Sequence, residues 1–290
     1  MTAVANQKVK GKIPNETIKE FWRLYKKDKL AVFGLFMLVF FVLTAALADF
    51  APYNPFRISD ESFAPPSLKH FFGTDDLGRD LFSGVVYSVR TSLFIAVSAT
   101  LLSTFIGVFV GAIAGYFSGS IGGFWTRVTE VAQTIPAFLL CILLVSIFKP
   151  SIWNVLLSIG VLNWTRMARV VRAEFLSLRE RQFVESALSL GESRTRIIFS
   201  EILPNVLPVI IATFSMDVAY AVVFESGLSF LGLGDFNVMS LGILLYTAKQ
   251  YLHVWWISFI PGLVLFLLAL SFNLIGDQLS IIFSPKLRQR

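Results

Sequence analysis

Long apolar runs, almost free of charged residues, follow one another along the chain. They cover residues 30–48, 91–115, 131–148, 151–171, 208–231 and 254–283. Hydrocarbon offers the backbone no hydrogen-bonding partner, so a run of about 20 apolar residues favours a membrane-spanning helix. In the fourth run, we expect Arg166 and Arg169 to reach the membrane surface with their long side chains. The pattern predicts an all-α integral membrane protein with six transmembrane helices.

Lysine and arginine are distributed unequally between the segments that join these runs. With six spans and the N-terminus inside, 19 of the 25 basic residues fall on one side. Basic residues in short loops mark the cytoplasmic side, so we expect both termini in the cytoplasm. The expected order is a cytoplasmic segment 1–29, a first transmembrane helix 30–48, an extracytoplasmic segment 49–90, a five-helix core 91–283 with a cytoplasmic segment 172–204, and a cytoplasmic tail 284–290.

The end of the first run, Ala46-Leu47-Ala48, resembles a signal-peptidase site. A signal-peptide core has only about 7–15 apolar residues, fewer than this run, and a long leader precedes the run here. We therefore expect a retained span.

Composition narrows the class of protein. Apolar residues make up 55% of the chain and charged residues 15%, against about 25% charged in a typical soluble domain. This excludes a disordered chain and an ordinary soluble domain, and the placement of the basic residues assigns the net charge of +6 to topology rather than to nucleic-acid binding. With Cys141 as the single cysteine and only two histidines, His70 and His253, we expect no disulfide, metal or cofactor in this chain.

The segment 172–204 is the most informative connection. Its apolar spacing predicts a helix over 172–190, a turn at Gly191, and a second helix over 193–202 that ends near Leu203-Pro204. Membrane orientation alone needs only a few basic residues, not some 40 residues with two helices. We favour an exposed docking surface over an ordinary positively charged loop.

Gly107, Gly111 and Gly115 are spaced so that they share one helix face in the second run. Small residues at this spacing let another helix approach closely. The spacing alone leaves open whether that helix belongs to this chain or to a second membrane subunit.

Asp217 and Glu225 are acids inside the fifth apolar run. Acids within a membrane span are candidates for function, and a separation of eight residues turns them by only about 80° around a helix. Both could face one cavity, or Glu225 could lie at the outer interface, where a charge costs little.

Thr74, Asp75 and Asp76 in the extracytoplasmic segment have the pattern of a helix N-terminus, in which a hydroxyl accepts hydrogen bonds from free backbone N–H groups and carboxylates in the first turn suit the helix dipole. A ligand contact is the alternative.

Motifs for nucleotide or hydrolytic chemistry are absent. There is no P-loop, no H-E-x-x-H and no G-x-S-x-G. Gly232-Leu233-Gly234-Asp235 matches the GxGD motif of intramembrane aspartyl proteases, but the Tyr-Asp pair of those enzymes is missing. An ion-coupled secondary transporter is a second alternative; it would explain Asp217 but would leave segment 172–204 without a role.

Several motifs together resemble the OppC/DppC type of permease subunit in ABC importers for dipeptides, oligopeptides and nickel. Glu185-Ser186-Ala187, Gly191 and Leu203-Pro204 look like the "EAA" loop of such permeases, with serine at its middle position and Glu201 where isoleucine is usual. The likeness covers about residues 20–290, and its further motifs are 73–80, 90–93, 164–180, 228–234 and 272–277. Ser88 replaces a usual glycine, and 235–242 lacks the usual proline and tryptophan.

The resemblance implies a type I ABC importer permease fold in a prokaryotic inner membrane, without covalent chemistry in this chain. It implies a homologous second permease of the OppB/DppB type, two ATP-binding subunits that hold ATP and magnesium, and an extracytoplasmic protein that delivers peptides. The EAA-like residues would couple the ATPases to the spans, and Asp217 and Glu225 are candidates for the translocation path. The composition has no His or Met cluster of the kind that nickel would favour.

Overall fold

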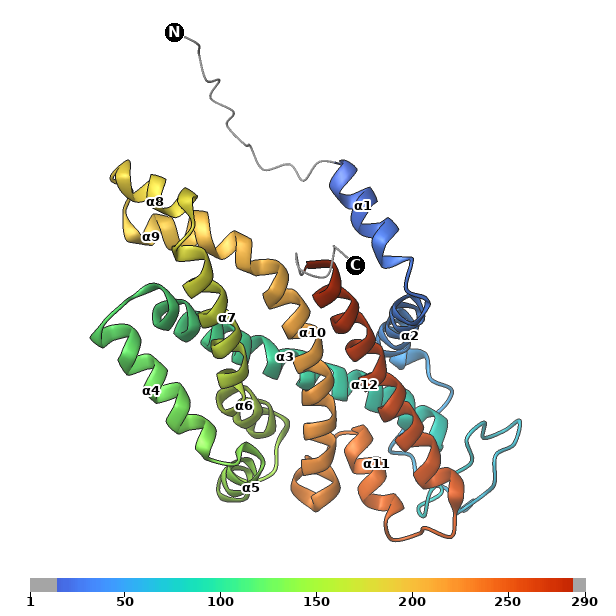
Figure 1. Ribbon diagram of the computed structural model, residues 1–290. Coiled ribbons are helices and arrows are strands. Elements are labelled where there is room, and N and C mark those ends of the chain that lie inside the picture. Colours follow the sequence, from blue (N-terminus) through green and yellow to red (C-terminus); the bar gives the residue numbers. More distant parts are fainter. Residues whose placement is uncertain (1–14, 284–290) are drawn as a thin grey trace.

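A computed structural model gives the fold of residues 15–283 (Figure 1). The predicted segment 1–29 is described only from Asn15 onward, and the predicted tail 284–290 lies outside the described residues. Within this range the chain is helical, and a single β-bridge between Thr74 and Asp80 is the only extended pairing. The helices are α1 (Asn15–Tyr25), α2 (Lys29–Ala46), α3 (Leu81–Tyr116), α4 (Ser120–Thr134), α5 (Ala137–Phe148), α6 (Ile152–Leu162), α7 (Trp164–Arg179), α8 (Gln182–Ser189), α9 (Arg194–Arg196), α10 (Leu203–Leu228), α11 (Leu241–Ala248) and α12 (Trp255–Phe283). A 3₁₀ turn (Ala48–Phe50) follows α2, and π-helical turns flank α10 at Ile197–Ile202 and Ser229–Leu233.

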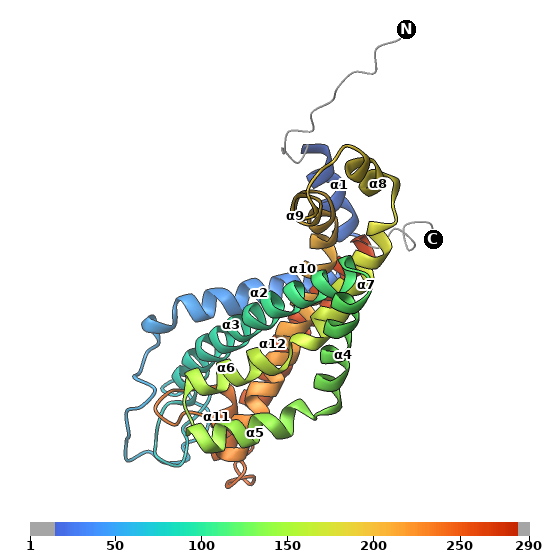
Figure 2. The same cartoon turned by 90° about the vertical axis from the view of Figure 1, so that its left-hand side faces the viewer.

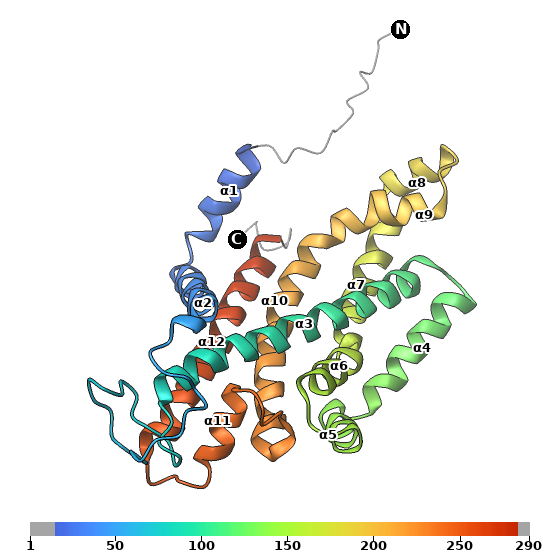
Figure 3. The same cartoon turned by 180° about the vertical axis from the view of Figure 1, so that it is seen from behind.

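The long apolar helices form the centre of the bundle. α3 packs along α7 and α10, α10 packs along α12, and α2 lies on the outer side of α12 (Figures 1 and 3). By length and composition, four helices in the described range are suited to crossing a membrane: α2, α3, the helix that contains α10, and α12. A fifth crossing results if α4 and α5, which are bent by 78°, form one broken span.

The run at 131–148 is not the single helix predicted. α4 ends at Thr134 and α5 starts at Ala137, because Pro136 has no N–H group to continue a helix and forces Ile135 into an extended conformation (ψ 123°). The run at 151–171 is likewise divided, between α6 and α7 at Asn163.

The two ends of the molecule carry different kinds of structure (Figures 1 and 2). α1, α8 and α9 gather at the end where α12 finishes, whereas α5, α11 and the loop over residues 51–80 lie at the opposite end. These are the groups of segments that the distribution of basic residues assigns to opposite sides of the membrane.

The three spaced glycines of α3 face α7 of the same chain. A Cβ atom on Gly107 would lie 2.7 Å from the carbonyl oxygen of Trp164, and one on Gly111 would lie 2.5 Å from that of Ala168. A Cβ atom on Gly115 would likewise come too close to the Phe175 side chain and to the carbonyl oxygen of Arg172. The helix that they admit therefore belongs to this chain.

The loop over residues 51–80 is folded, but its threonine does not begin a helix. Thr74 Oγ1 accepts a hydrogen bond from the N–H of Ala64, 2.8 Å away, across the loop. The N-cap of α3 is Asp80, whose Oδ2 accepts from the N–H of Ser83 at 2.8 Å, so the prediction for Thr74 was wrong. Burial raises the pKa of Asp75 above its ordinary value even though Arg79 Nε lies only 2.6 Å from its Oδ2.

Candidate functional site

The predicted docking surface is a helical hairpin at the end of the bundle. Instead of one helix over 172–190, the chain breaks after Arg179, and Arg181 is extended (ψ 148°) before α8. This break lets α8 fold back so that Val184 and Ala187 are buried against Ile197 and Ile202. The free energy gained by burying these apolar side chains exceeds the local preference of the sequence for one continuous helix.

Gly191 ends α8 in the conformation predicted for it. Its φ is +78°, a left-handed value that glycine adopts without strain. The N–H of Glu192 donates to the carbonyl oxygen of Ala187 at 3.1 Å, and the N–H of Gly191 donates to that of Leu188 at 3.0 Å. This pair of bonds is a Schellman motif, which satisfies the last carbonyl groups of a helix.

The second helix of the hairpin does not end at Leu203-Pro204, as the sequence predicts. Helical structure continues from Arg194 to Leu233 through a π-helical turn, where the N–H of Leu203 donates to the carbonyl oxygen of Ile198. Pro204 has no N–H group to donate, and the wider π turn accommodates this loss without ending the helix. The hairpin is therefore joined directly to the long helix α10.

The hairpin exposes apolar and polar groups together. Among the EAA-like residues, Ala187 is buried and Leu203 partly buried, whereas Glu185, Ser186, Gly191 and Pro204 are exposed. Leu190 is 82% exposed and Phe199 61% exposed beside them. Sequence reasoning missed Leu190 and Phe199 because their exposure depends on how α8 folds back.

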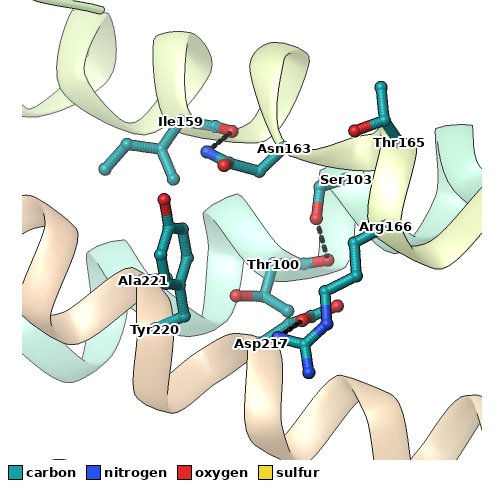
Figure 4. Close-up of a pocket in the computed structure, with 9 residues that line it drawn as sticks. All are labelled: Thr100, Ser103, Ile159, Asn163, Thr165, Arg166, Asp217, Tyr220 and Ala221. Carbon is teal, nitrogen blue, oxygen red and sulfur yellow. Dashed lines mark hydrogen bonds and ion pairs between the residues drawn. The ribbon is translucent and has the colours of Figure 1, made fainter. Parts of the chain in front are cut away.

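A cavity of about 180 Å³ lies inside the bundle between α3, α6, α7 and α10 (Figure 4). Arg166 of α7 and Asp217 of α10 form an ion pair across it, with Nη1 and Oδ1 3.0 Å apart. Asp217 is therefore paired with Arg166, whose side chain is 49% exposed. Tyr220 and Asn163 also line the cavity.

Thr100 of α3 contributes a polar atom to this cavity that sequence reasoning missed. The residue is 2% exposed, and its Oγ1 has no hydrogen-bond partner within the described residues. Buried hydroxyl groups are normally paired. An unpaired hydroxyl beside the Arg166–Asp217 ion pair in this cavity indicates room for water or for a polar group of a ligand.

Glu225 lies eight residues beyond Asp217 on α10 but does not line this cavity. It is 1% exposed, so bulk water does not solvate its carboxyl group. Ser229 Oγ donates to its Oε1 at 2.8 Å, and Ser92 and Ser226 donate to its Oε2 at 3.3 and 3.4 Å. Ser92 also accepts from the N–H of Leu241, so this cluster connects α3, α10 and α11.

Asp235 of the GxGD sequence has a structural role. Its Oδ2 accepts from the N–H of Ile152 at 3.3 Å, and its Oδ1 accepts from the N–H and side-chain amide of Asn237, both at 3.0 Å. These bonds connect the loop after α10 to the start of α6.

Comparison with protein families agrees with these features. Residues 107–289 match the family described as "Binding-protein-dependent transport system inner membrane component". The chain belongs to this family. Residues 17–66 match a second description, the N-terminal transmembrane domain of oligopeptide transport permease C.

Curated relatives match this permease along nearly its whole length. It is 37% identical to the dipeptide transport system permease protein DppC of Bacillus subtilis, over 93% of this chain and 86% of the relative. It is 35% identical to the DppC protein of Escherichia coli K12, over 98% of both chains. The resemblance to OppC/DppC-type permeases is thereby confirmed, and neither a secondary transporter nor an aspartyl protease is favoured.

Solved structures show the same fold. An inward-facing form of the MetNI methionine ABC transporter matches with a TM-score of 0.59 and 15% identity, over 69% of this permease and 96% of that chain. A second crystal form matches with a TM-score of 0.58. These structures show the fold of an ABC importer permease, and the family match with the curated relatives shows that the chain is a transport subunit.

Proposed function

We propose that this permease imports peptides, as half of a translocation path completed by a homologous second permease. The observation that carries the choice of substrate is the 35–37% identity, over more than 90% of the chain, to permeases named for dipeptide transport. ATP and magnesium are bound by two separate ATPase subunits. An extracytoplasmic binding protein delivers the peptide to the end formed by the loop 51–80 and α11.

The proposal includes six spans and cytoplasmic termini. Six crossings result if α4 with α5 and α6 with α7 each make one broken span beside α2, α3, α10 and α12. At about 1.5 Å per residue, the 27 residues of α6 and α7 together are long enough to cross, even with a bend. The shared location of α1, α8 and the end of α12 supports this orientation (Figure 3).

The hairpin α8–Gly191–α9 is the proposed docking element for an ATPase subunit. Its exposed Leu190 and Phe199 supply apolar contact area of the kind found at interfaces. The hairpin is preceded by α7 and continues into α10. A displacement of the hairpin would therefore move both helices that carry the Arg166–Asp217 pair. Closure of the ATPases would in this way change access to the cavity, which we place on the translocation path.

The Gly191 turn provides the test. Gly191→Val places a β-branched residue at φ +78°, where L-residues are strained by about 1–2 kcal/mol or more. The matched control is Gly191→Asn, because asparagine tolerates the left-handed region and a Cβ atom at this position meets nothing within 4 Å. In proteoliposomes that contain the full complex, we expect the valine variant to lose about tenfold or more of ATP-dependent dipeptide uptake, and the asparagine variant to keep most of it.

Two results would contradict the proposal. Full dipeptide uptake by Gly191→Val would remove the coupling role of the turn, as would failure of ATPase subunits to copurify with the wild-type permease. Uptake of another solute, with no competition from dipeptides, would leave the coupling role intact and overturn the choice of substrate.

A further inference from the structure

A second cavity, of about 390 Å³, lies at the end of the bundle that carries the hairpin. The end of α3, α4 from its start to Glu130, and one face of α7 border it, and it is open to the surface; Figures 1 and 3 show these three helices together. Three arginines line it, Arg127, Arg172 and Arg179, against one acid, Glu130. The cavity is therefore positively charged.

The three arginines differ in how far their charges are satisfied. Arg127 forms an ion pair with Glu130, with Nη1 and Oε2 2.9 Å apart. Arg179 Nη1 reaches the carbonyl oxygens of Gly115 and Tyr116 at 3.4 and 3.5 Å, and its Nη2 forms a long ion pair with Glu180, 3.8 Å from Oε1.

The side chain of Arg172 has no hydrogen bond or ion pair within the described residues, and its Nε is buried. A buried guanidinium nitrogen without an acceptor is costly, and an anion in the cavity would remove that cost.

The start of α4 adds donors of a second kind. The N-cap residue, Gly119, has no side chain to accept from the N–H groups of the first turn, and no other side chain caps this 15-residue helix. Free N–H groups and the helix dipole favour an anion at such an end. A Cβ atom on Gly119 or Gly123 would meet nothing within 4 Å, so the space beside this backbone is open.

We propose that this cavity binds a phosphate group, with Arg172 as its central contact and Arg179 and the start of α4 around it. Phosphate suits both donors, because a guanidinium group binds two of its oxygens and a helix N-terminus a third. The phosphate comes from the headgroup of an anionic phospholipid or from free phosphate. On the same turns of α4, Ile121 and Phe124 are 53% and 61% exposed and could contact acyl chains. The proposal is independent of the peptide substrate.

The experiment compares Arg172→Gln with Arg169→Gln in the purified full complex. Arg169 is an exposed arginine on the same helix, one turn earlier, and does not line the cavity. The probes are inorganic phosphate, added to the complex in nanodiscs of phosphatidylcholine, and nanodiscs that also contain phosphatidylglycerol. Binding is measured by native mass spectrometry and by the shift in melting temperature.

We expect phosphate or phosphatidylglycerol to bind to the wild type and to the Arg169→Gln variant, and about tenfold more weakly to Arg172→Gln, because a charged hydrogen-bond donor is lost. Gly123→Leu, which fills the open space and favours the helix, should weaken binding in the same way. Binding of only one probe supports the site and shows whether its phosphate group comes from a lipid headgroup or from free phosphate. Binding of neither probe, or equal binding to the two glutamine variants, overturns the proposal.

Discussion

Asp217 and Glu225 are two acids on one helix, and they lie in opposite surroundings. Asp217 lies beside an open cavity, and its partner is the half-exposed Arg166 of α7. Glu225 is 1% exposed, accepts hydrogen bonds from Ser92, Ser226 and Ser229, and does not line the Asp217 cavity.

This difference separates a part of α10 that is held to its neighbours, around Glu225, from a part around Asp217 that can move with the docking hairpin. Through Ser92 and the N–H of Leu241, Glu225 connects α10 to α3 and to the start of α11. Asp217 connects α10 to α7, and α7 leads to the docking hairpin. A movement of the hairpin therefore reaches Asp217 before it reaches Glu225. This comparison predicts that changes at Glu225 affect stability, whereas changes at Asp217 affect transport.

The largest loss of stability is expected for Glu225→Ala. It leaves three buried serine hydroxyls without their acceptor and creates a cavity, which together cost about 3 kcal/mol in the free energy of unfolding. Glu225→Gln keeps an acceptor oxygen and the volume, so we expect a loss of only about 1 kcal/mol. Denaturant unfolding of the purified protein in detergent measures both, and equal losses would show that the serine cluster does not stabilise this region.

A smaller loss is expected at the glycines that bring α3 and α7 together. The added methyl group of Gly111→Ala would meet the carbonyl oxygen of Ala168, which belongs to the backbone and cannot rotate away. We expect a loss of about 2 kcal/mol from overpacking. Gly84→Ala is the control on the same helix, because its nearest contact is an ordinary 3.7 Å. It should be neutral or stabilising in the same unfolding experiment; an equal loss in both variants would contradict close packing at Gly111.

The smallest effect on stability, combined with a large effect on transport, is expected for Asp217→Asn. Because Arg166 is half-exposed, water can solvate its charge, and we expect a loss of less than about 1 kcal/mol. Dipeptide uptake should fall severalfold, while Arg169→Gln, away from the cavity, should leave uptake unchanged. Normal uptake by Asp217→Asn would remove Asp217 from the path.

The fold could be predicted from the sequence where helices are long and apolar. α10 and α12 largely follow nearly charge-free runs, and α3 contains such a run but begins at Leu81, ten residues before the predicted span and within the predicted extracytoplasmic segment. Breaks and continuations were harder to predict, because proline has two effects here. Pro136 divides a predicted span, whereas Pro204 lies within a continuous helix that widens into a π turn. The local sequence does not say whether tertiary packing holds a helix together across a proline.

The site could be predicted only in part. Gly191 was identified because its backbone requirement is local. The partner of Asp217 was not, since Arg166 is 51 positions away in sequence and was expected at the membrane surface. The same holds for Ser92, which reaches Glu225 from α3. Contacts between distant segments depend on the packing of the bundle, which periodicity does not encode.

Nucleotide-dependent labelling of two cysteine variants tests the central claim most directly. Ser88 and Thr100 lie on α3, are 0% and 2% exposed, and have hydroxyl groups without partners among residues 15–283, but of the two only Thr100 lines the Asp217 cavity. Ser88→Cys and Thr100→Cys would be made in a Cys141→Ala background, which removes the native thiol. If the cavity lies on the path, addition of ATP and magnesium to the full complex changes the thiol labelling rate at position 100 and not at position 88. Labelling rates at both positions that are independent of nucleotide would contradict the account.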